Sequence, residues 1–176
     1  YITETIMENI DLLKQLFTLF EQKFNPKQKN PQLDNKKLED FHNAVRRRFP
    51  QDMENMRIFH FMARIITATF KTNFYKVEKR SYSFRLDPHI LDPIVFSSRV
   101  YGIFLVCGHY SRGIHLRASE IARGGLRLLN ISNKNYKFMA RSTMFLNYDL
   151  GPVAQHLKHK DIAEGGSKGV LLPQQI

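Results

Sequence analysis

Cysteine and acidic residues are scarce in this chain and tryptophan is absent. The single cysteine, Cys107, has no partner for an internal disulfide, which excludes a disulfide-stapled scaffold and suits a reducing compartment. No apolar run approaches the roughly 20 residues of a membrane-spanning helix, because the longest extends only from Tyr101 to Cys107. No secretory signal opens the sequence, since Tyr1 leads directly into an amphipathic pattern. We therefore expect an intracellular protein, mitochondrial or cytoplasmic, with no membrane partner.

The shortage of acidic residues leaves a large positive charge. Lys and Arg number 27 against 16 Asp and Glu, a formal charge of +11. Such a charge is typical of proteins that bind nucleic acid, an anionic membrane or an anionic small substrate. Only Arg46-Arg47-Arg48 forms a tight cluster, and at a predicted helix end it complements the helix dipole. We expect no nucleic-acid partner, while a basic module for RNA or anionic lipid stays an alternative whose binding would weaken with salt.

Helical periodicity dominates the first part of the chain. It predicts helices over residues 3–24, 37–48 and 52–72. Thr5 and Glu8 have capping-box spacing, and Asp52 is placed to cap the third helix. The positions expected to pack recur at three- and four-residue intervals: Ile6, Ile10, Leu13, Phe17 and Phe20, then Met56, Phe59, Ala63, Ile66 and Phe70.

Strand-like patterns follow. They predict strands over residues 82–86, 101–107, 111–118, 126–129 and 169–172. The continuous apolar run at 101–107 predicts burial on both faces. A helix is expected from about Tyr136 to Lys158, kinked or restarted at Gly151-Pro152. The pattern predicts an α/β fold with a helical extension over residues 1–74 and an α/β domain over 75–176.

Two glycine-centred elements, at residues 121–127 and 161–170, each place adjacent glycines beside a cationic side chain. Paired glycines allow turns and close approach of a ligand to the backbone. A neighbouring cation favours a carboxylate or phosphate ligand. A Walker-type phosphate loop is excluded because Lys168 precedes Gly169 and leads into an apolar, strand-like run. No dinucleotide fingerprint occurs either, so we expect no cofactor site in this chain.

Together these elements resemble the substrate domain of amino-acid dehydrogenases, most closely that of the large NAD-specific glutamate dehydrogenases. The resemblance covers about residues 71 to 173 in the family's order and is less distinct before residue 71. The matching stretches are residues 71–75, 83–88, 101–104, 113–117, 121–127, 147–148, 158–162 and 164–169. The resemblance implies the mixed sheet of that substrate domain, truncated before a separate NAD-binding domain.

The resemblance also assigns roles to residues. Lys168 falls on the family's catalytic lysine, and Arg123 falls where smaller relatives grip a substrate carboxylate with a lysine. Lys158 matches a second carboxylate-binding lysine, although Lys160 competes for that role. The implied substrate-binding set is completed by four glycines: Gly124, Gly125, Gly165 and Gly166. Ala163 departs from the pattern, because the family typically has proline there.

The implied reaction is the NAD-dependent oxidative deamination of L-glutamate to 2-oxoglutarate and ammonium. Two fixed cations suit a dicarboxylate, and a crowded, desolvated lysine favours its neutral, basic form. The isolated segment is expected to be inactive, and the whole enzyme to form a homo-oligomer. A dehydrogenase of another amino acid is the remaining alternative.

Several residues have simpler interpretations. His115 is expected to be a satisfied core or interface histidine, and Arg117 and Arg127 to pair with carboxylates such as Glu120. His156 and His159 near Asp161 lack a further ligand at zinc-like spacing, so no metal is expected.

Overall fold

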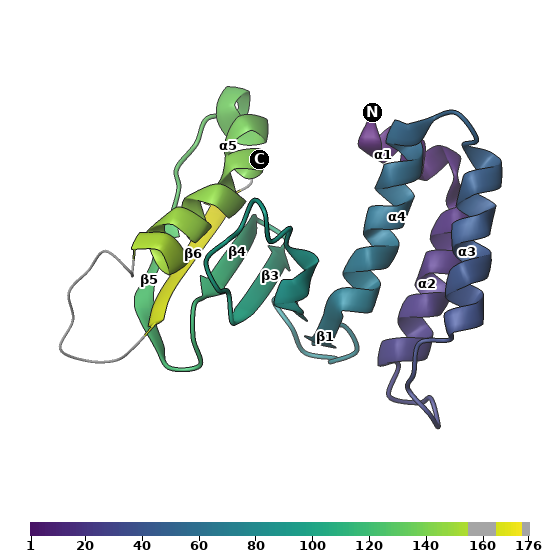
Figure 1. Cartoon of the computed structure of the whole chain (residues 1–176), viewed down its shortest axis with the longest axis horizontal. Coiled ribbons are helices and arrows are strands. Elements are labelled where there is room, and N and C mark those ends of the chain that lie inside the picture. The colour runs from purple at the N-terminus through teal and green to yellow at the C-terminus, as the bar shows by residue number, and fades with distance from the viewer. Residues whose placement is uncertain (155–164, 174–176) are drawn as a thin grey trace. The chain divides into compact units, whose positions relative to one another are not determined.

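The computed structural model describes residues 1–154 and 165–173 (Figure 1). The chain divides into two compact units, Tyr1–Thr69 and Phe70–Ile176. The first is helical and the second contains a six-stranded mixed sheet, which confirms the α/β fold class. Strand β1 (Thr69–Thr72) precedes residue 74 and is already part of the sheet. The domain limits of 1–74 and 75–176 stay a prediction.

Four helices form the first unit: α1 (Ile2–Glu8), α2 (Ile10–Phe24), α3 (Asn35–Arg48) and α4 (Met53–Ala68). The single helix predicted over residues 3–24 is therefore wrong, because Asn9 interrupts it. The predicted capping box is wrong as well, since Thr5 lies inside α1 and its hydroxyl contacts Asn55. Asp52 does cap α4, accepting a hydrogen bond from the Asn55 backbone N–H at 3.0 Å.

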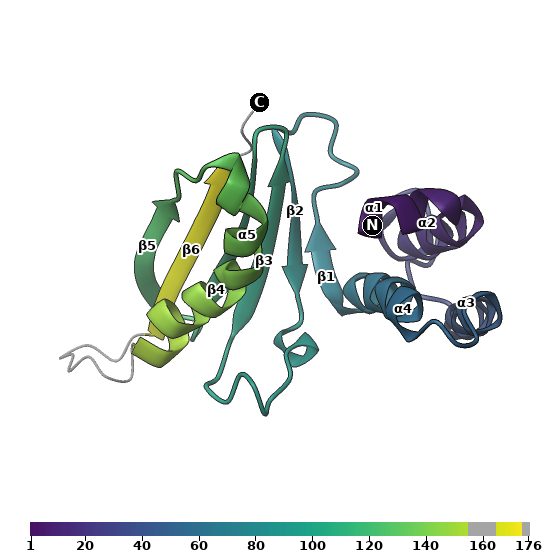
Figure 2. The same cartoon turned by 90° about the horizontal axis from the view of Figure 1, so that it is seen from above.

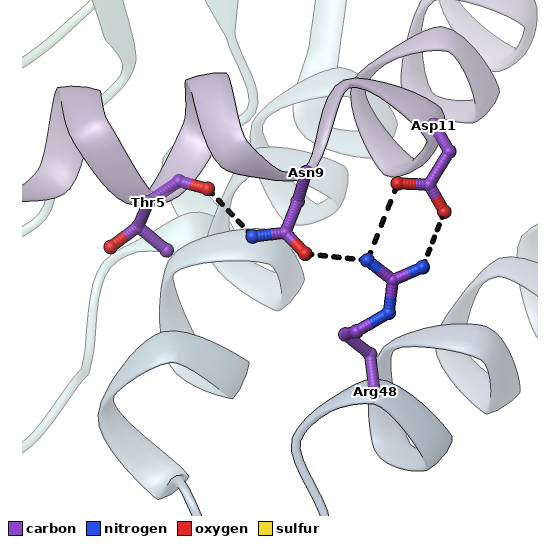
Figure 3. Close-up of polar contacts among 4 residues, drawn as sticks. All are labelled: Thr5, Asn9, Asp11 and Arg48. Atoms are coloured by element: carbon purple, nitrogen blue, oxygen red, sulfur yellow. Dashed lines mark hydrogen bonds and ion pairs between the residues drawn. The ribbon is translucent and has the colours of Figure 1, made fainter.

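Polar contacts among Thr5, Asn9, Asp11 and Arg48 stabilise the interruption at Asn9 (Figure 3). The Asn9 amide donates to the Thr5 carbonyl at 2.8 Å, and its oxygen accepts from Arg48 at 2.7 Å. The other guanidinium nitrogen of Arg48 forms an ion pair with Asp11 at 2.7 Å. Asparagine favours such breaks because its side chain competes with the backbone for hydrogen bonds. Arg48, part of the basic cluster, is thus bound within the chain.

The core of the helical unit is apolar. Its fully buried side chains come from three helices: Leu12, Leu16 and Leu19 of α2, Phe41 and Val45 of α3, and Phe59 and Ala63 of α4. The stripe predicted for the first helix is wrong, because Ile10 and Phe17 are exposed. The buried face instead follows Leu12, Leu16 and Leu19, spaced by four and three residues along α2. The stripe predicted for the third helix is confirmed for Phe59 and Ala63.

Helix α4 ends earlier than predicted. The helix stops at Ala68 rather than near Thr72, and β1 begins at Thr69. β-branched and aromatic residues in the run Thr69–Thr72 favour a strand. The Lys23 ammonium donates to the last carbonyls of α4, those of Ile66 at 3.1 Å and Thr67 at 2.7 Å. A cation at this helix end stabilises it.

The sheet of the second unit has the order β1-β2-β3-β4-β6-β5. Its further strands are β2 (Ser81–Leu86), β3 (Gly102–Gly108), β4 (Ser111–Arg117), β5 (Ala122–Leu128) and β6 (Gly165–Pro173). β2, β3, β4 and β6 pair antiparallel in that order, whereas β5 runs parallel to β6. Every predicted strand is confirmed, with limits shifted by a few residues.

Helix α5 (Asn133–Tyr148) connects β5 to β6 and lies over one face of the sheet (Figure 2). A five-residue π-type turn, η2 (Asp149–Val153), follows it, so the predicted interruption at Gly151-Pro152 is confirmed. Asn147 is fully buried and its amide donates to the Ile114 carbonyl at 3.2 Å, tying α5 to β4. Burial of β3 on both faces is confirmed only at its start, where Gly102 and Ile103 are buried, and is wrong toward its end, where Cys107 is exposed.

Candidate functional site

Lys168 lies in the middle of β6, between β4 and β5. It pairs with Leu116 on one side and with Gly125 on the other. A methyl group added at Gly125 would lie 3.6 Å from the Lys168 Nζ atom, so the amine extends over the glycine. Since Gly125 has no side chain, the space above β5 is left to the lysine. Lys168 itself is partly buried.

The turn after α5 covers the base of this lysine. A methyl group at Gly151 would lie 3.4 Å from the Lys168 Cβ and 3.5 Å from its backbone nitrogen. Gly151 belongs to η2, and π-type turns are frequent at functional sites. Lys168 therefore projects from the face of the sheet that α5 and η2 cover. Gly151 thus packs against the Lys168 Cβ atom, while the Nζ atom of the same side chain lies over Gly125.

Arg123 projects from the same face as Lys168. It pairs with Gly166, which lies two residues before Lys168 on β6. Side chains two residues apart on a strand share a face, and residues paired across two strands do too. The structure thus brings two of the predicted cations onto neighbouring strands. Lys158 and Lys160 fall within residues 155–164, outside the described part of the chain, as do His156, His159, Asp161 and Ala163.

The glycines of the two motifs lie inside strands β5 and β6. The prediction that they form turns is wrong, since the described glycines all avoid the left-handed region. They serve close packing instead. A methyl group at Gly124 would lie 1.4 Å from the Ser167 carbonyl oxygen, and one at Gly165 would lie 2.1 Å from the Ser119 Oγ. Roles of Gly124, Gly125, Gly165 and Gly166 in substrate binding stay predictions.

His115 and Ser167 form a contact beside the site that sequence reasoning did not find. The Ser167 Oγ and the His115 Nε2 are 2.7 Å apart. His115 is thus hydrogen-bonded to Ser167, as expected of a satisfied histidine. Only the register of β4 against β6 places them together, because they are 52 residues apart.

The electrostatics around this pair favour a neutral imidazole. Burial, and then the nearby Arg117 guanidinium, hold the pKa of His115 below its usual range. Arg117 donates to the backbone carbonyl of Glu120 at 2.8 Å rather than to its carboxylate. The predicted pairing of Arg117 with that side chain is therefore wrong.

A cavity of about 580 Å³ lies in the connection between β2 and β3. Asp87, Phe96 and Arg99 are among its lining residues. This connection is anchored to the end of α5, because the Tyr148 hydroxyl accepts a hydrogen bond from the Ser98 N–H at 2.5 Å. The cavity contains neither Lys168 nor Arg123.

The described residues contain neither a metal-ligand cluster nor a membrane-spanning helix. Within residues 1–154 and 165–173, no group of three or more His, Cys, Asp or Glu side chains is placed to hold a metal ion. No helix in the same ranges has the length and apolar character needed to cross a membrane.

Comparison with known proteins decides between the interpretations. The family described as bacterial NAD-glutamate dehydrogenase, catalytic domain, matches residues 46–176. The chain belongs to this family. The match confirms the resemblance and extends it back beyond residue 71, into α3 of the helical unit.

Individual members of the glutamate dehydrogenase family are also similar. The NAD-specific glutamate dehydrogenase of Neurospora crassa is 46% identical over 106 residues, which are 60% of this chain and 10% of that protein. The enzyme of the same name from Saccharomyces cerevisiae is 35% identical over 136 residues, 76% of this chain and 12% of that protein. One from Pseudomonas aeruginosa is 28% identical over 188 residues, the whole of this chain and 11% of that protein. The chain thus spans about a tenth of these relatives.

Proposed function

We propose that this chain supplies the substrate-binding part of an NAD-dependent glutamate dehydrogenase. The enzyme would convert L-glutamate, water and NAD to 2-oxoglutarate, ammonium and NADH. Family membership over residues 46–176 supports the reaction class. The observation that carries the site is the position of the Lys168 amine over Gly125, on the same face as Arg123.

Each residue has a chemical role in this proposal. Arg123, with Lys158 or Lys160, would bind the carboxylates of glutamate, because charge-assisted hydrogen bonds both hold and orient such groups. The Lys168 amine would act as the general base and take a proton from the water that attacks the oxidised carbon. NAD, bound outside this chain, would accept the hydride from the glutamate Cα. The Gly125 gap lets substrate approach the lysine closely.

The wider assembly is part of the same proposal. We infer that the enzyme acts as a homo-oligomer inside the cell, in mitochondria or cytoplasm. A basic module for RNA or lipid gains no support from the basic cluster, because Arg48 pairs with Asp11 in the chain. A substrate other than glutamate also gains no support, because the relatives are named glutamate dehydrogenases.

Replacing Lys168 tests the proposal. In the intact enzyme, Lys168→Ala should lower kcat by about 100- to 10,000-fold, the usual contribution of a general base. Lys134→Ala, which removes an exposed lysine from α5, is the matched control and should leave kcat unchanged. Steady-state NADH formation with glutamate is the measurement. Parental turnover in Lys168→Ala would remove the lysine from the mechanism.

A further inference from the structure

One imidazole contacts both neighbours of Lys168. His115 hydrogen-bonds to Ser167 at 2.7 Å, on one side of the lysine. On the other side, a methyl group at Gly169 would lie only 2.7 Å from the His115 Cδ2 atom. His115 and Gly169 are also paired in the register of β4 and β6. The ring therefore spans the backbone of β6 at the position of the lysine.

His115 lies on the opposite face of the sheet from the Lys168 side chain. Successive residues of a strand point to opposite faces, so Ser167 and Gly169 face away from α5 while Lys168 faces toward it. The hydroxyl of Ser167 is buried, with the residue only 7% exposed. The His115–Ser167 contact therefore lies on the face of β6 opposite to the one on which substrate would bind.

The surroundings of His115 fix the orientation of the ring. The Phe104 ring lies beside it, with the two centroids 6.1 Å apart. The Leu126 Cδ1 atom, like the His115 Cδ2 atom, would lie 2.7 Å from a methyl group at Gly169, so both side chains occupy the space that this glycine leaves. A neutral imidazole has one donor and one acceptor nitrogen. Its Nε2 atom can therefore either accept a hydrogen bond from the Ser167 hydroxyl or donate one to that oxygen. An oriented ring with a single short hydrogen bond restricts rotation of β6.

We propose that His115 and Ser167 are positioning residues that aim the Lys168 amine over Gly125. The proposal rests on the proposed role of Lys168 as the base. Loss of the His115–Ser167 bond would let β6 shift or rotate slightly, and the lysine tip would move with it. A misplacement of about 1 Å in a reacting group can lower the rate by about 100-fold. Arg123, the proposed carboxylate ligand, is carried by β5 rather than by β6, so we expect substrate affinity to change less than turnover.

Three variants of the intact enzyme separate the hydrogen bond from the packing. Ser167→Ala removes the hydroxyl and keeps the ring. His115→Met and His115→Gln have side chains of equal length, but only glutamine can replace the Nε2 group as a hydrogen-bonding partner. We expect Ser167→Ala and His115→Met to lower kcat by about 10- to 100-fold with little change in the KM for glutamate. His115→Gln should recover most of the lost kcat.

The controls distinguish positioning from general damage. The folded fraction of each variant is measured by circular dichroism, and kcat is expressed per folded enzyme. Parental kcat in both Ser167→Ala and His115→Met would overturn the positioning role, as would equal losses in His115→Gln and His115→Met. Lys168→Ala is measured in parallel. If that variant is inactive while the others are parental, only the positioning proposal fails; if Lys168→Ala keeps parental kcat, the proposed role of Lys168 as the base fails.

Discussion

The two units of this chain are stabilised in different ways. The helical unit, Tyr1–Thr69, buries large apolar side chains such as Leu12, Phe41 and Phe59 at its centre. In the sheet of the second unit, the strands that carry the site pack closely because glycines lack side chains, at Gly124 and Gly169 for example. The helical unit depends on buried apolar volume, whereas the site-bearing strands depend in addition on positions that carry no side chain.

This difference predicts how each unit responds to substitution. A core filled by apolar side chains tolerates swaps that conserve volume and is weakened by truncation. A glycine whose Cβ position is occupied by backbone tolerates no side chain, because backbone atoms cannot move aside as a flexible side chain can. The part of the chain that carries the proposed chemistry should therefore accept fewer substitutions than the helical unit does.

The largest effect is expected at Gly124. Gly124→Ala would place a methyl group 1.4 Å from the Ser167 carbonyl oxygen, so β5 must separate from β6. We expect a loss of stability above the about 1–3 kcal/mol that is typical of overpacking. Hydrogen exchange of β5 and β6 peptides in the intact enzyme measures it. Gly125→Ala is the matched control: among the described residues its methyl group would meet only the Lys168 Nζ, at 3.6 Å, so protection should persist while turnover falls. Equal protection in the two variants would contradict this account.

A large effect is also expected in the helical core. Phe59 is fully buried, and Phe59→Ala should destabilise the unit by about 3–5 kcal/mol through lost burial and the cavity left behind. Phe61, two positions along α4, is 56% exposed. Phe61→Ala should change stability by less than about 0.5 kcal/mol. Protease susceptibility of α4 in the intact enzyme compares the two. Similar cleavage of both variants would show that the core does not carry the unit's stability.

Sequence reasoning succeeded where a signal was local. Alternation and periodicity located the strands and helices, and the motif around Lys168 identified the family. Prediction failed where one side chain outside the pattern decided the outcome. Asn9 broke a helix that periodicity continued, because Arg48, 39 residues away, satisfies its oxygen. No sequence feature close to Asn9 predicts that Arg48 is its hydrogen-bond partner.

The site shows the same limit. Lys168 was predicted from its neighbours in the chain, but the role of the glycines was not. Paired glycines usually indicate turns, whereas Gly124 and Gly165 allow close packing inside strands. The contact between Ser167 and His115 depends on strand order, in which β4 pairs with β6 although β5, α5 and η2 lie between them in the chain. Register is a property of the assembled sheet and has no local sequence signature.

The smallest expected effect again concerns the helical unit, where two histidines meet. The Nδ1 atoms of His42 on α3 and His60 on α4 lie 2.6 Å apart, a separation that requires one shared proton. Burial, and then the Arg46 guanidinium, lower the pKa of His42 from its usual 6.5. Burial, then His42 and Arg46, lower that of His60. The folded unit therefore resists protonation of both rings.

This resistance gives the helical unit a pH dependence of definite sign. Below about pH 6.5 the unfolded chain takes up protons that the folded chain does not, so stability falls as the pH decreases. The loss levels off below the lowered folded pKa values, and above pH 7 the pair contributes no slope. Hydrogen exchange of α3 and α4 between pH 5 and 8 measures the effect, with His42→Gln as the control that flattens the profile. A profile unchanged by His42→Gln would assign the slope to other groups and remove the pair as the acid-sensitive point of this unit.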